Sequence, residues 1–179
     1  LHMPAESGSD QILKSMRRGY TVDYYRDLIS YARELIPRIS VASDFIVGFP
    51  GETDEEFQET VRLMEDIRFQ NCFIFKYSPR TGTKAAELED DVADAVKKAR
   101  NMRLLELQKG ISLAENKKLI GREVQVLIEG VSKSDPNKLS GRTRQNHIVV
   151  FNGSGESVGK LVHVLIHEVT DLTLYGTLT

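Results

Sequence analysis

The sequence is poor in cysteine and lacks tryptophan: Cys72 is its single thiol. One cysteine excludes a disulfide framework, a zinc site made of cysteines and a self-contained iron–sulfur site. No apolar run approaches the roughly 18–20 residues that a membrane-spanning helix needs. The first ten residues lack the basic and apolar regions of a signal peptide. With a free thiol, these features predict a cytoplasmic protein without a membrane partner.

The chain has no strong excess of charge of either sign. Its 179 residues are 40% hydrophobic and 28% charged, which is typical of a folded globular protein with a substantial core. A net charge of −2 gives no global signal for nucleic-acid binding. Among the 4 histidines, His163 and His167 are the nearest pair, but four residues along a strand separate them by about 13 Å. We therefore expect no metal site built on histidine.

Residues 9–117 alternate helical patterns with short apolar runs, which predicts an α/β arrangement. Ser9 or Asp10 and Thr21 fit the starts of two helices, Pro37 ends the second, and Thr53–Glu56 predicts a capping box for a third. The other predicted elements are buried strands at Val41–Val47 and Cys72–Tyr77 and a helix at about Val92–Lys117. This order favours right-handed βαβ units and a parallel sheet.

From residue 118 onward the hydrophobic period changes to that of strands. Val124, Val126 and Ile128 alternate with polar residues, and Ile148–Phe151 and Leu161–Ile166 are further apolar runs. Short strands separated by Gly and Asn turns indicate a small β-barrel or sandwich. We therefore predict two domains, at residues 1–117 and 118–179.

Polar residues near predicted strand ends are the first candidate site. Ligands in α/β proteins bind beyond the carboxyl ends of parallel strands, where Glu6–Gly8, Gly48 and Tyr77–Arg80 are expected to lie. Asp44 lies within a predicted buried strand, so its carboxylate needs either a structural partner or a ligand. Arg80 could bind a carboxylate or phosphate as a planar fork, or simply be exposed.

Two of these segments also have purely structural explanations. Glu6–Ser9 fits a loop that caps a helix as well as it fits a ligand contact. Gly48–Thr53 runs from a strand into a helix, where it could bind an anion or form a plain tight turn. It has neither the phosphate-loop pattern nor the dinucleotide-binding pattern.

A local cluster of cations is the second candidate site. Lys133, Lys138, Arg142 and Arg144 stand near Asn146 in one short segment of the predicted barrel. Small β-barrels bind single-stranded nucleic acid with such groups, although a solvated basic loop has the same composition. We expect this segment to bind RNA.

Several segments together carry a family resemblance. They are His2–Ser9, Met16–Thr21, Ser43–Thr53 and Tyr77–Ala85, followed by Gly141–Thr143 and Asn146–Gly153. In this order they resemble the radical S-adenosylmethionine (SAM) methylthiotransferases, in their tRNA-modifying branch. The resemblance implies an α/β fold: the C-terminal portion of an open parallel (β/α) radical SAM barrel, followed by an all-β, OB-like TRAM barrel that binds RNA.

The resemblance also implies an activity for the parent protein. Such enzymes add a methylthio group to C2 of an isopentenylated adenosine beside the tRNA anticodon. The implied cofactors are S-adenosylmethionine and two 4Fe–4S clusters; the implied partners are the tRNA anticodon stem-loop and an electron donor, with the enzyme a monomer. Related enzymes act on threonylcarbamoyl-adenosine in tRNA or on a ribosomal-protein aspartate. A non-catalytic RNA-binding module is the alternative from another class.

The same resemblance assigns the first candidate site to S-adenosylmethionine, through Glu6, Ser7, Gly8, Asp44, Gly48, Tyr77 and Arg80. Two departures matter. The family usually has Gln where this chain has Glu6, and the family's Cys-x-x-x-Cys-x-x-Cys motif is absent. The chain therefore resembles a C-terminal fragment that ligates neither cluster, leaves the catalytic residues unknown and is expected to be inactive alone.

Overall fold

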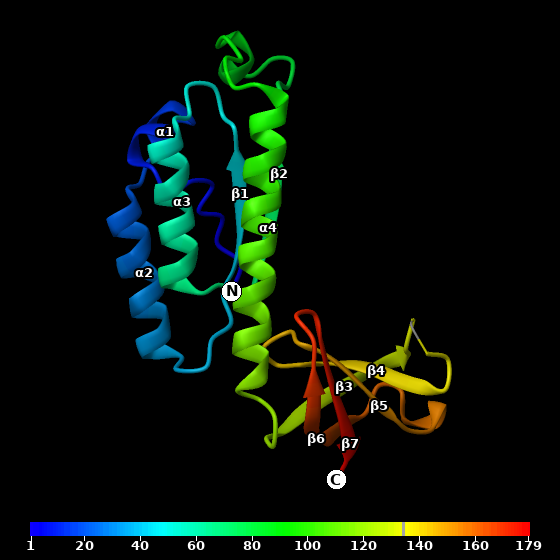
Figure 1. Ribbon diagram of the computed structural model, residues 1–179. Helices are drawn as coiled ribbons and strands as arrows, with labels where there is room; N and C mark the ends of the chain where they lie inside the picture. The colour runs from blue at the N-terminus through cyan, green and yellow to red at the C-terminus, as the bar shows by residue number, and fades with distance from the viewer. Residues whose placement is uncertain (134) are drawn as a thin grey trace. The chain divides into compact units, whose positions relative to one another are not determined.

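The computed structural model describes residues 1–133 and 135–179, and it divides into two compact units, Leu1–Lys109 and Gly110–Thr179 (Figure 1). The first unit is α/β and the second contains a closed barrel, so the predicted fold class is confirmed. The division between the units falls within one helix, α4 (Asp94–Lys117). The domain boundary at residue 117 stays a prediction.

In the first unit, two parallel strands alternate with helices. Its other elements are α1 (Asp10–Ser15), α2 (Val22–Leu35), β1 (Ala42–Val47), α3 (Asp54–Ile67), β2 (Asn71–Lys76) and the 3-10 helix η1 (Lys84–Glu87). β1 pairs with β2 from Ala42 opposite Asn71 to Val47 opposite Lys76. The N-terminal segment runs along β1, with parallel bridges from His2 to Ala42 and from Glu6 to Phe45.

The helix starts agree with the sequence analysis. The side chains of Ser9 and Thr21 accept hydrogen bonds at the starts of α1 and α2. At α3, Thr53 and Glu56 form the complete capping box. These signals are local, because each cap satisfies backbone N–H groups only a few residues away.

One face of the β1–β2 pair is buried and the other is open to solvent. Phe45 and Val47 are fully buried on the first face. Phe73 and Phe75 of β2 are 50% and 53% exposed, so the prediction of a buried strand at Cys72–Tyr77 is wrong for this face of β2. Successive side chains of a strand point to opposite faces, and the register pairs Asp44 with Phe73 on the open face.

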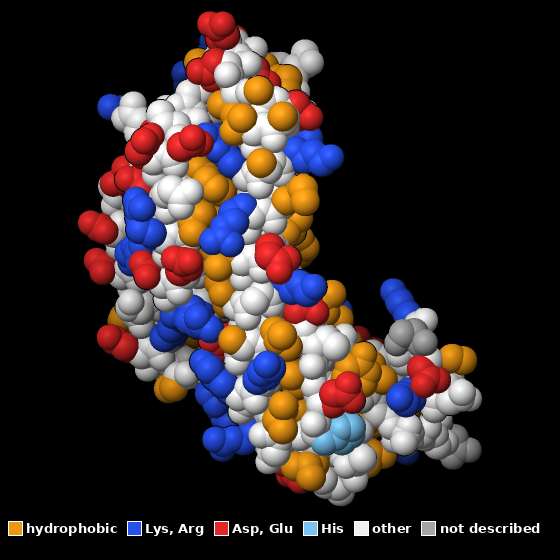
Figure 2. All heavy atoms as spheres, in the orientation of Figure 1, with side chains coloured by type: hydrophobic (Ala, Val, Ile, Leu, Met, Phe, Trp, Pro, Cys, Tyr) orange, Lys and Arg blue, Asp and Glu red, His pale blue; other side chains and the backbone are white. Residues whose placement is uncertain are grey.

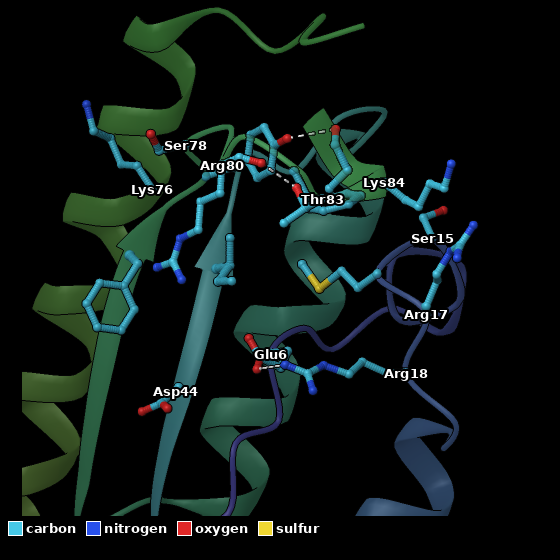
Figure 3. A pocket seen from close by; sticks show the side chains of 16 residues that line it. Glu6, Ser15, Arg17, Arg18, Asp44, Lys76, Ser78, Arg80, Thr83 and Lys84 are labelled. Atoms are coloured by element: carbon cyan, nitrogen blue, oxygen red, sulfur yellow. Dashed lines mark hydrogen bonds and ion pairs between the residues drawn. The ribbon is translucent and has the colours of Figure 1, made fainter. Parts of the chain in front are cut away.

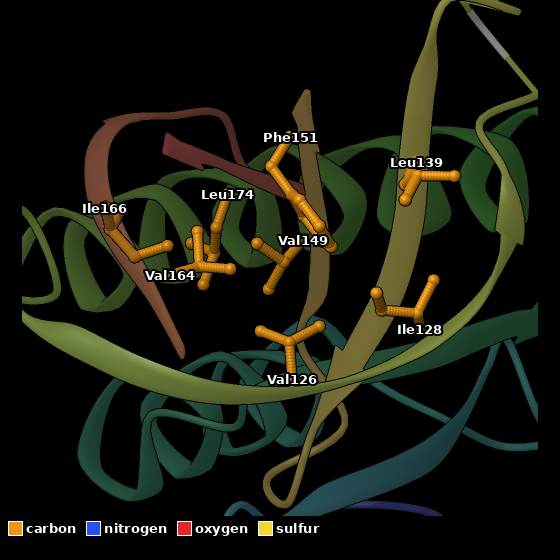
Figure 4. Close-up of a cluster of buried hydrophobic side chains, with 8 residues drawn as sticks. All are labelled: Val126, Ile128, Leu139, Val149, Phe151, Val164, Ile166 and Leu174. Atoms are coloured by element: carbon orange, nitrogen blue, oxygen red, sulfur yellow. The ribbon is translucent and has the colours of Figure 1, made fainter. Parts of the chain in front are cut away.

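The second unit is a five-stranded barrel in the order β3-β4-β5-β7-β6. Its strands are β3 (Glu123–Val131), β4 (Lys138–Thr143), β5 (Ile148–Asn152), β6 (Leu161–Val169) and β7 (Thr173–Leu178), with the 3-10 helix η2 at Gly155–Ser157. Eight inward-pointing side chains fill the barrel (Figure 4). Among them, Val126, Val149 and Val164 have no exposed surface.

β4 is the strand with the weakest hydrophobic pattern, because Leu139 is its one large apolar side chain. A Cβ atom at Gly141 would lie 2.3 Å from the backbone oxygen of Leu127. The close approach of β3 and β4 therefore requires glycine at this position.

Charged side chains of both signs are interleaved on the helical face of the first unit (Figure 2), in keeping with the net charge of −2. Among the described residues, no helix is long and apolar enough to cross a membrane.

Candidate functional site

A cavity of about 750 Å³ opens at the carboxyl ends of β1 and β2 in the first unit (Figure 3). This volume is within the usual range for a small-molecule site. Four predicted site residues line it: Glu6, Asp44, Tyr77 and Arg80. The structure thus brings together groups from three strand-end segments that are far apart in the sequence.

Glu6 is held in the cavity wall by its own backbone. Its N–H donates to the Asp44 carbonyl at 2.8 Å, and its carbonyl accepts from the Ile46 N–H at 3.0 Å. Its φ of 66° is left-handed, which is unusual for a residue other than glycine. The carboxylate forms an ion pair with Arg18, from the turn after α1. Burial raises the pKa of Glu6, and the Arg18 guanidinium opposes this.

Asp44 has a structural partner and also faces the cavity. Its Oδ1 lies 2.9 Å from His2 Nε2, and its side chain is 27% exposed. A structural partner and a ligand contact are therefore both compatible with the position of the Asp44 carboxylate. A protonated His2 would form an ion pair with Asp44, whereas a neutral one would form a hydrogen bond.

The loop after β2 supplies an aromatic side chain and a cation. The Tyr77 hydroxyl donates to the Ala85 carbonyl at 2.9 Å, and the ring meets Phe49 edge-on at 5.1 Å between centroids. Arg80 extends into the cavity in Figure 3, and its guanidinium has no partner in the part of the chain that the structure describes. Arg80 is therefore available to a ligand.

The other three predicted cofactor residues lie beside the cavity lining. Ser7 is hydrogen-bond partner to Thr60 of α3, and the Gly8 N–H donates to the Thr60 hydroxyl at 2.8 Å. The Gly48 N–H donates to Glu52 at 2.7 Å, so the loop's own carboxylate occupies this donor. These contacts support the structural explanations for Ser7, Gly8 and Gly48, and the site assignment itself stays a prediction.

The cavity is also lined by cations outside the predicted site residues. Arg17 and Arg18 reach it from the turn after α1, and Lys76 and Lys84 from the β2–η1 segment. Only the family resemblance drew attention to Arg17 and Arg18, through the segment Met16–Thr21. The sequence at the end of an exposed helix does not indicate that the following turn lies near the carboxyl ends of the strands.

The buried charge of Glu6 predicts a pH effect on stability. Because the pKa of Glu6 in the folded protein exceeds its ordinary value of 4.5, the folded state binds the proton more tightly than the unfolded state. The free energy of unfolding of the natural chain, relative to Glu6→Gln, should therefore fall as pH rises from 4.5 through the raised pKa. Urea unfolding of both proteins between pH 4 and 8 measures this difference; a constant difference contradicts it.

In the barrel, the predicted RNA-binding residues fall into two groups. Arg142 and Lys138 are engaged: Arg142 Nη1 donates to Asn146 Oδ1 at 3.0 Å and its Nε lies 3.4 Å from Glu129, while Lys138 lies 3.5 Å from Asp135. Lys133 and Arg144 are exposed and have no partner among the described residues. Asn146 has a left-handed φ of 69° in the turn that also carries Arg144.

Arg142 and Arg144 should therefore affect RNA binding differently. Arg144→Ala removes a free cation, so we expect weaker anticodon stem-loop binding and a salt slope reduced by about one. Arg142→Ala should weaken binding and also loosen the turn, because Arg142 holds Asn146. Fluorescence anisotropy across salt concentrations, with thermal melting of each variant, tests this. Identical melting of the two variants would contradict the turn-holding role.

None of the described residues forms a group of three metal-ligating side chains. Cys72 is buried, and burial raises the pKa of its thiol. A single buried thiol does not fit an iron–sulfur cluster, because such clusters are held by several cysteine thiolates.

Comparison with known proteins matches the two ends of the chain to different families. Residues 1–64 match the Radical SAM superfamily and residues 117–179 match the TRAM domain. The chain thus combines a radical SAM segment with a TRAM domain.

Curated relatives extend this match over nearly the whole chain. The tRNA-2-methylthio-N(6)-dimethylallyladenosine synthase of Carboxydothermus hydrogenoformans is 50% identical over 178 residues, which are 99% of this chain and 40% of the relative. The protein of the same name from Moorella thermoacetica is 47% identical over 176 residues, with 98% and 40% covered. The chain thus matches part of the sequence of radical SAM methylthiotransferases. It spans about 40% of the length of these relatives.

Proposed function

We propose that this chain supplies the S-adenosylmethionine pocket and the RNA-binding barrel of a tRNA methylthiotransferase. The enzyme would add a methylthio group to C2 of isopentenylated adenosine next to the anticodon. The observation that carries the proposal is the cavity at the strand ends, where opposite charges stand beside aromatic rings in a chain that also has a TRAM domain.

The chemistry of the cavity fits S-adenosylmethionine. Glu6 and Asp44 offer carboxylates to its sulfonium and ammonium groups, and Arg80 offers a planar fork to its carboxylate. Phe49, Tyr77 and Ile46 supply apolar surface for the adenine. When bound, S-adenosylmethionine would supply the methyl group and the radical that activates the substrate C–H bond.

The residues of this chain do not fit an iron–sulfur cluster. The sequence has 1 cysteine, and that thiol is buried. The role that we assign to the chain is therefore to bind and orient S-adenosylmethionine and RNA, while cluster ligands come from outside these 179 residues.

The basic segment of the barrel supports RNA as substrate. Its free cations, Lys133 and Arg144, lie on the β3–β4 loop and the β4–β5 turn. Phosphate neutralisation by such groups gives affinity without requiring a particular sequence. The relatives named above are synthases of a modified tRNA nucleoside.

Nucleoside mass spectrometry of total tRNA tests the proposal, comparing cells with and without the gene that encodes this chain. We expect the methylthio nucleoside to disappear and isopentenyl-adenosine to accumulate. Loss of a methylthio-threonylcarbamoyl nucleoside instead would identify threonylcarbamoyl-adenosine in tRNA as the substrate. An unchanged nucleoside profile would contradict the tRNA reaction and leave a ribosomal-protein substrate or plain RNA binding.

A further inference from the structure

The turn after α1 places an arginine in a backbone conformation that favours glycine. Arg17 has a φ of 59°, and it directly follows Met16, the C-cap residue of α1. Its N–H donates to the Lys14 carbonyl at 3.0 Å, and the Arg18 N–H donates to the Leu13 carbonyl at 2.9 Å. Such helix ends usually have glycine at this position, because a side chain is strained there.

Three of the four described non-glycine residues with this conformation lie at the cavity or in the predicted RNA-binding turn. The described residues other than glycine with positive φ are Glu6, Arg17, Arg68 and Asn146. Glu6 and Arg17 line the cavity, and Asn146 lies in the predicted RNA-binding turn. Backbone strain of this kind persists where the surrounding structure holds it, and it clusters at functional sites.

The cations of the cavity differ in whether they are already paired. Arg18 pairs with Glu6, and Lys76 lies 2.8 Å from Asp94. Arg17 has no partner among the described residues, and Lys84 has only the exposed Glu87, at 3.1 Å. The available positive charge is therefore at the mouth of the cavity as well as at Arg80.

Figure 3 shows Ser15, Arg17 and Lys84 together on one side of the cavity, while Arg80 points toward its interior. Arg17 and Lys84 come from different segments, the turn after α1 and the start of η1. A guanidinium and an ammonium suit an anion with several oxygen atoms, which is the chemistry of a phosphodiester. The Ser15 hydroxyl donates its proton to the Gln11 carbonyl at 3.0 Å.

We propose that Arg17 and Lys84 form a phosphodiester-binding rim at the mouth of this cavity. The rim holds the backbone of a single-stranded RNA loop while a base of that loop enters the cavity. This inference rests on the proposed function, because it takes RNA as the substrate. It adds a second RNA contact, in the first unit, to the one predicted for the barrel.

Arg17→Gly tests the rim, because binding and stability should move in opposite directions. Glycine relieves the left-handed strain, so the melting temperature should rise by about 2 °C or more. Loss of the guanidinium should lower the affinity for a synthetic anticodon stem-loop roughly tenfold at low salt and reduce the salt slope by about one. Arg17→Lys, which keeps the charge, should retain most of the affinity.

Arg68→Gly is the matched control. Arg68 has the same left-handed conformation, with a φ of 53°, but caps α3 just before β2 begins, at the strand end opposite the cavity. RNA affinity should be unchanged in this variant. Arg144→Ala should add its own loss to that of Arg17→Gly, because the two arginines belong to different units.

The outcomes separate this inference from the proposed function. Failure of the natural chain to bind the stem-loop counts against the proposed function. Binding by the natural chain and equal binding by Arg17→Gly overturns the rim alone. An aspartate-containing peptide that binds in an Arg17-dependent manner, when the RNA does not, would also overturn it by assigning the rim to a protein substrate.

Discussion

Replacement of Arg100 by Met should destabilise the first unit by about 3–5 kcal/mol, because it leaves a buried carboxylate without its cation. The side chains of Arg100 and Glu52 are 7% and 1% exposed, and Arg100 Nη1 lies 2.7 Å from Glu52 Oε2. The same carboxylate oxygen accepts the Gly48 N–H at 2.7 Å. Arg100 thereby fixes the loop between β1 and α3 that carries Phe49 into the cavity.

The variant should also show a distinctive pH dependence. Burial raises the pKa of Glu52, while the Gly48 N–H and Arg100 lower it. Without Arg100 the folded-state pKa rises further above the unfolded value, so the folded variant takes up a proton more readily. Its stability deficit should therefore be largest near pH 8 and shrink as pH falls toward 5.

Urea unfolding monitored by tyrosine fluorescence measures this effect, because the signal comes mainly from the first unit. The chain has 6 tyrosines and no tryptophan, and all the tyrosines except Tyr175 lie in the first unit. Arg103→Met is the matched control, because Arg103 is exposed on the same helix and should change stability by less than about 0.5 kcal/mol. The double variant Arg100→Met with Glu52→Gln should recover much of the loss and lose the pH dependence. A small, pH-independent effect of Arg100→Met would contradict the buried pair.

The elements of the fold could be predicted where their signals are local. The capping box at Thr53–Glu56 and the N-cap at Thr21 act within one turn of helix, so a few residues determine them. The barrel was recognised from alternation along single strands. In contrast, the exposure of Phe73 depends on what covers one face of the sheet, and no pattern within β2 records that.

The candidate site was predictable in position but only partly in composition. Residues at strand ends could be expected to converge, and Glu6, Asp44 and Arg80 do line one cavity. The ion pair between Glu6 and Arg18 depends on the turn after α1, where Arg17 has a left-handed conformation. Glycine is the usual residue in this conformation, and position 17 is an arginine. The left-handed conformation of Arg17 therefore could not be predicted from the sequence.

Gly8 illustrates how a residue beside a site can be essential to it without touching a ligand. A Cβ atom at Gly8 would lie 2.5 Å from the Glu59 carbonyl oxygen and 2.5 Å from Thr60 Cα. Both are backbone atoms of α3, so no side-chain rotation can relieve the clash. The N-terminal segment packs this closely because the Gly8 N–H donates to the Thr60 hydroxyl.

Gly8→Ala should therefore cost about 3 kcal/mol of stability in the first unit, at the upper end of the range for overpacked interiors. The displaced segment also carries Glu6 two residues earlier, so the cavity wall should shift with it. S-adenosylmethionine binding, measured by calorimetry on the complete enzyme, should weaken in the same variant even under conditions where it remains folded. Unfolding in urea gives the stability change directly.

Gly19→Ala is the control for the loss of a glycine as such. No atom lies within 4 Å of a Cβ built at Gly19, so alanine should fit there and change stability by no more than about 1 kcal/mol, in the stabilising direction. Equal effects of the two substitutions would mean that chain flexibility, and not contact with α3, explains Gly8. A large loss confined to Gly8→Ala would instead show that close packing against α3 holds the Glu6–Gly8 segment in place.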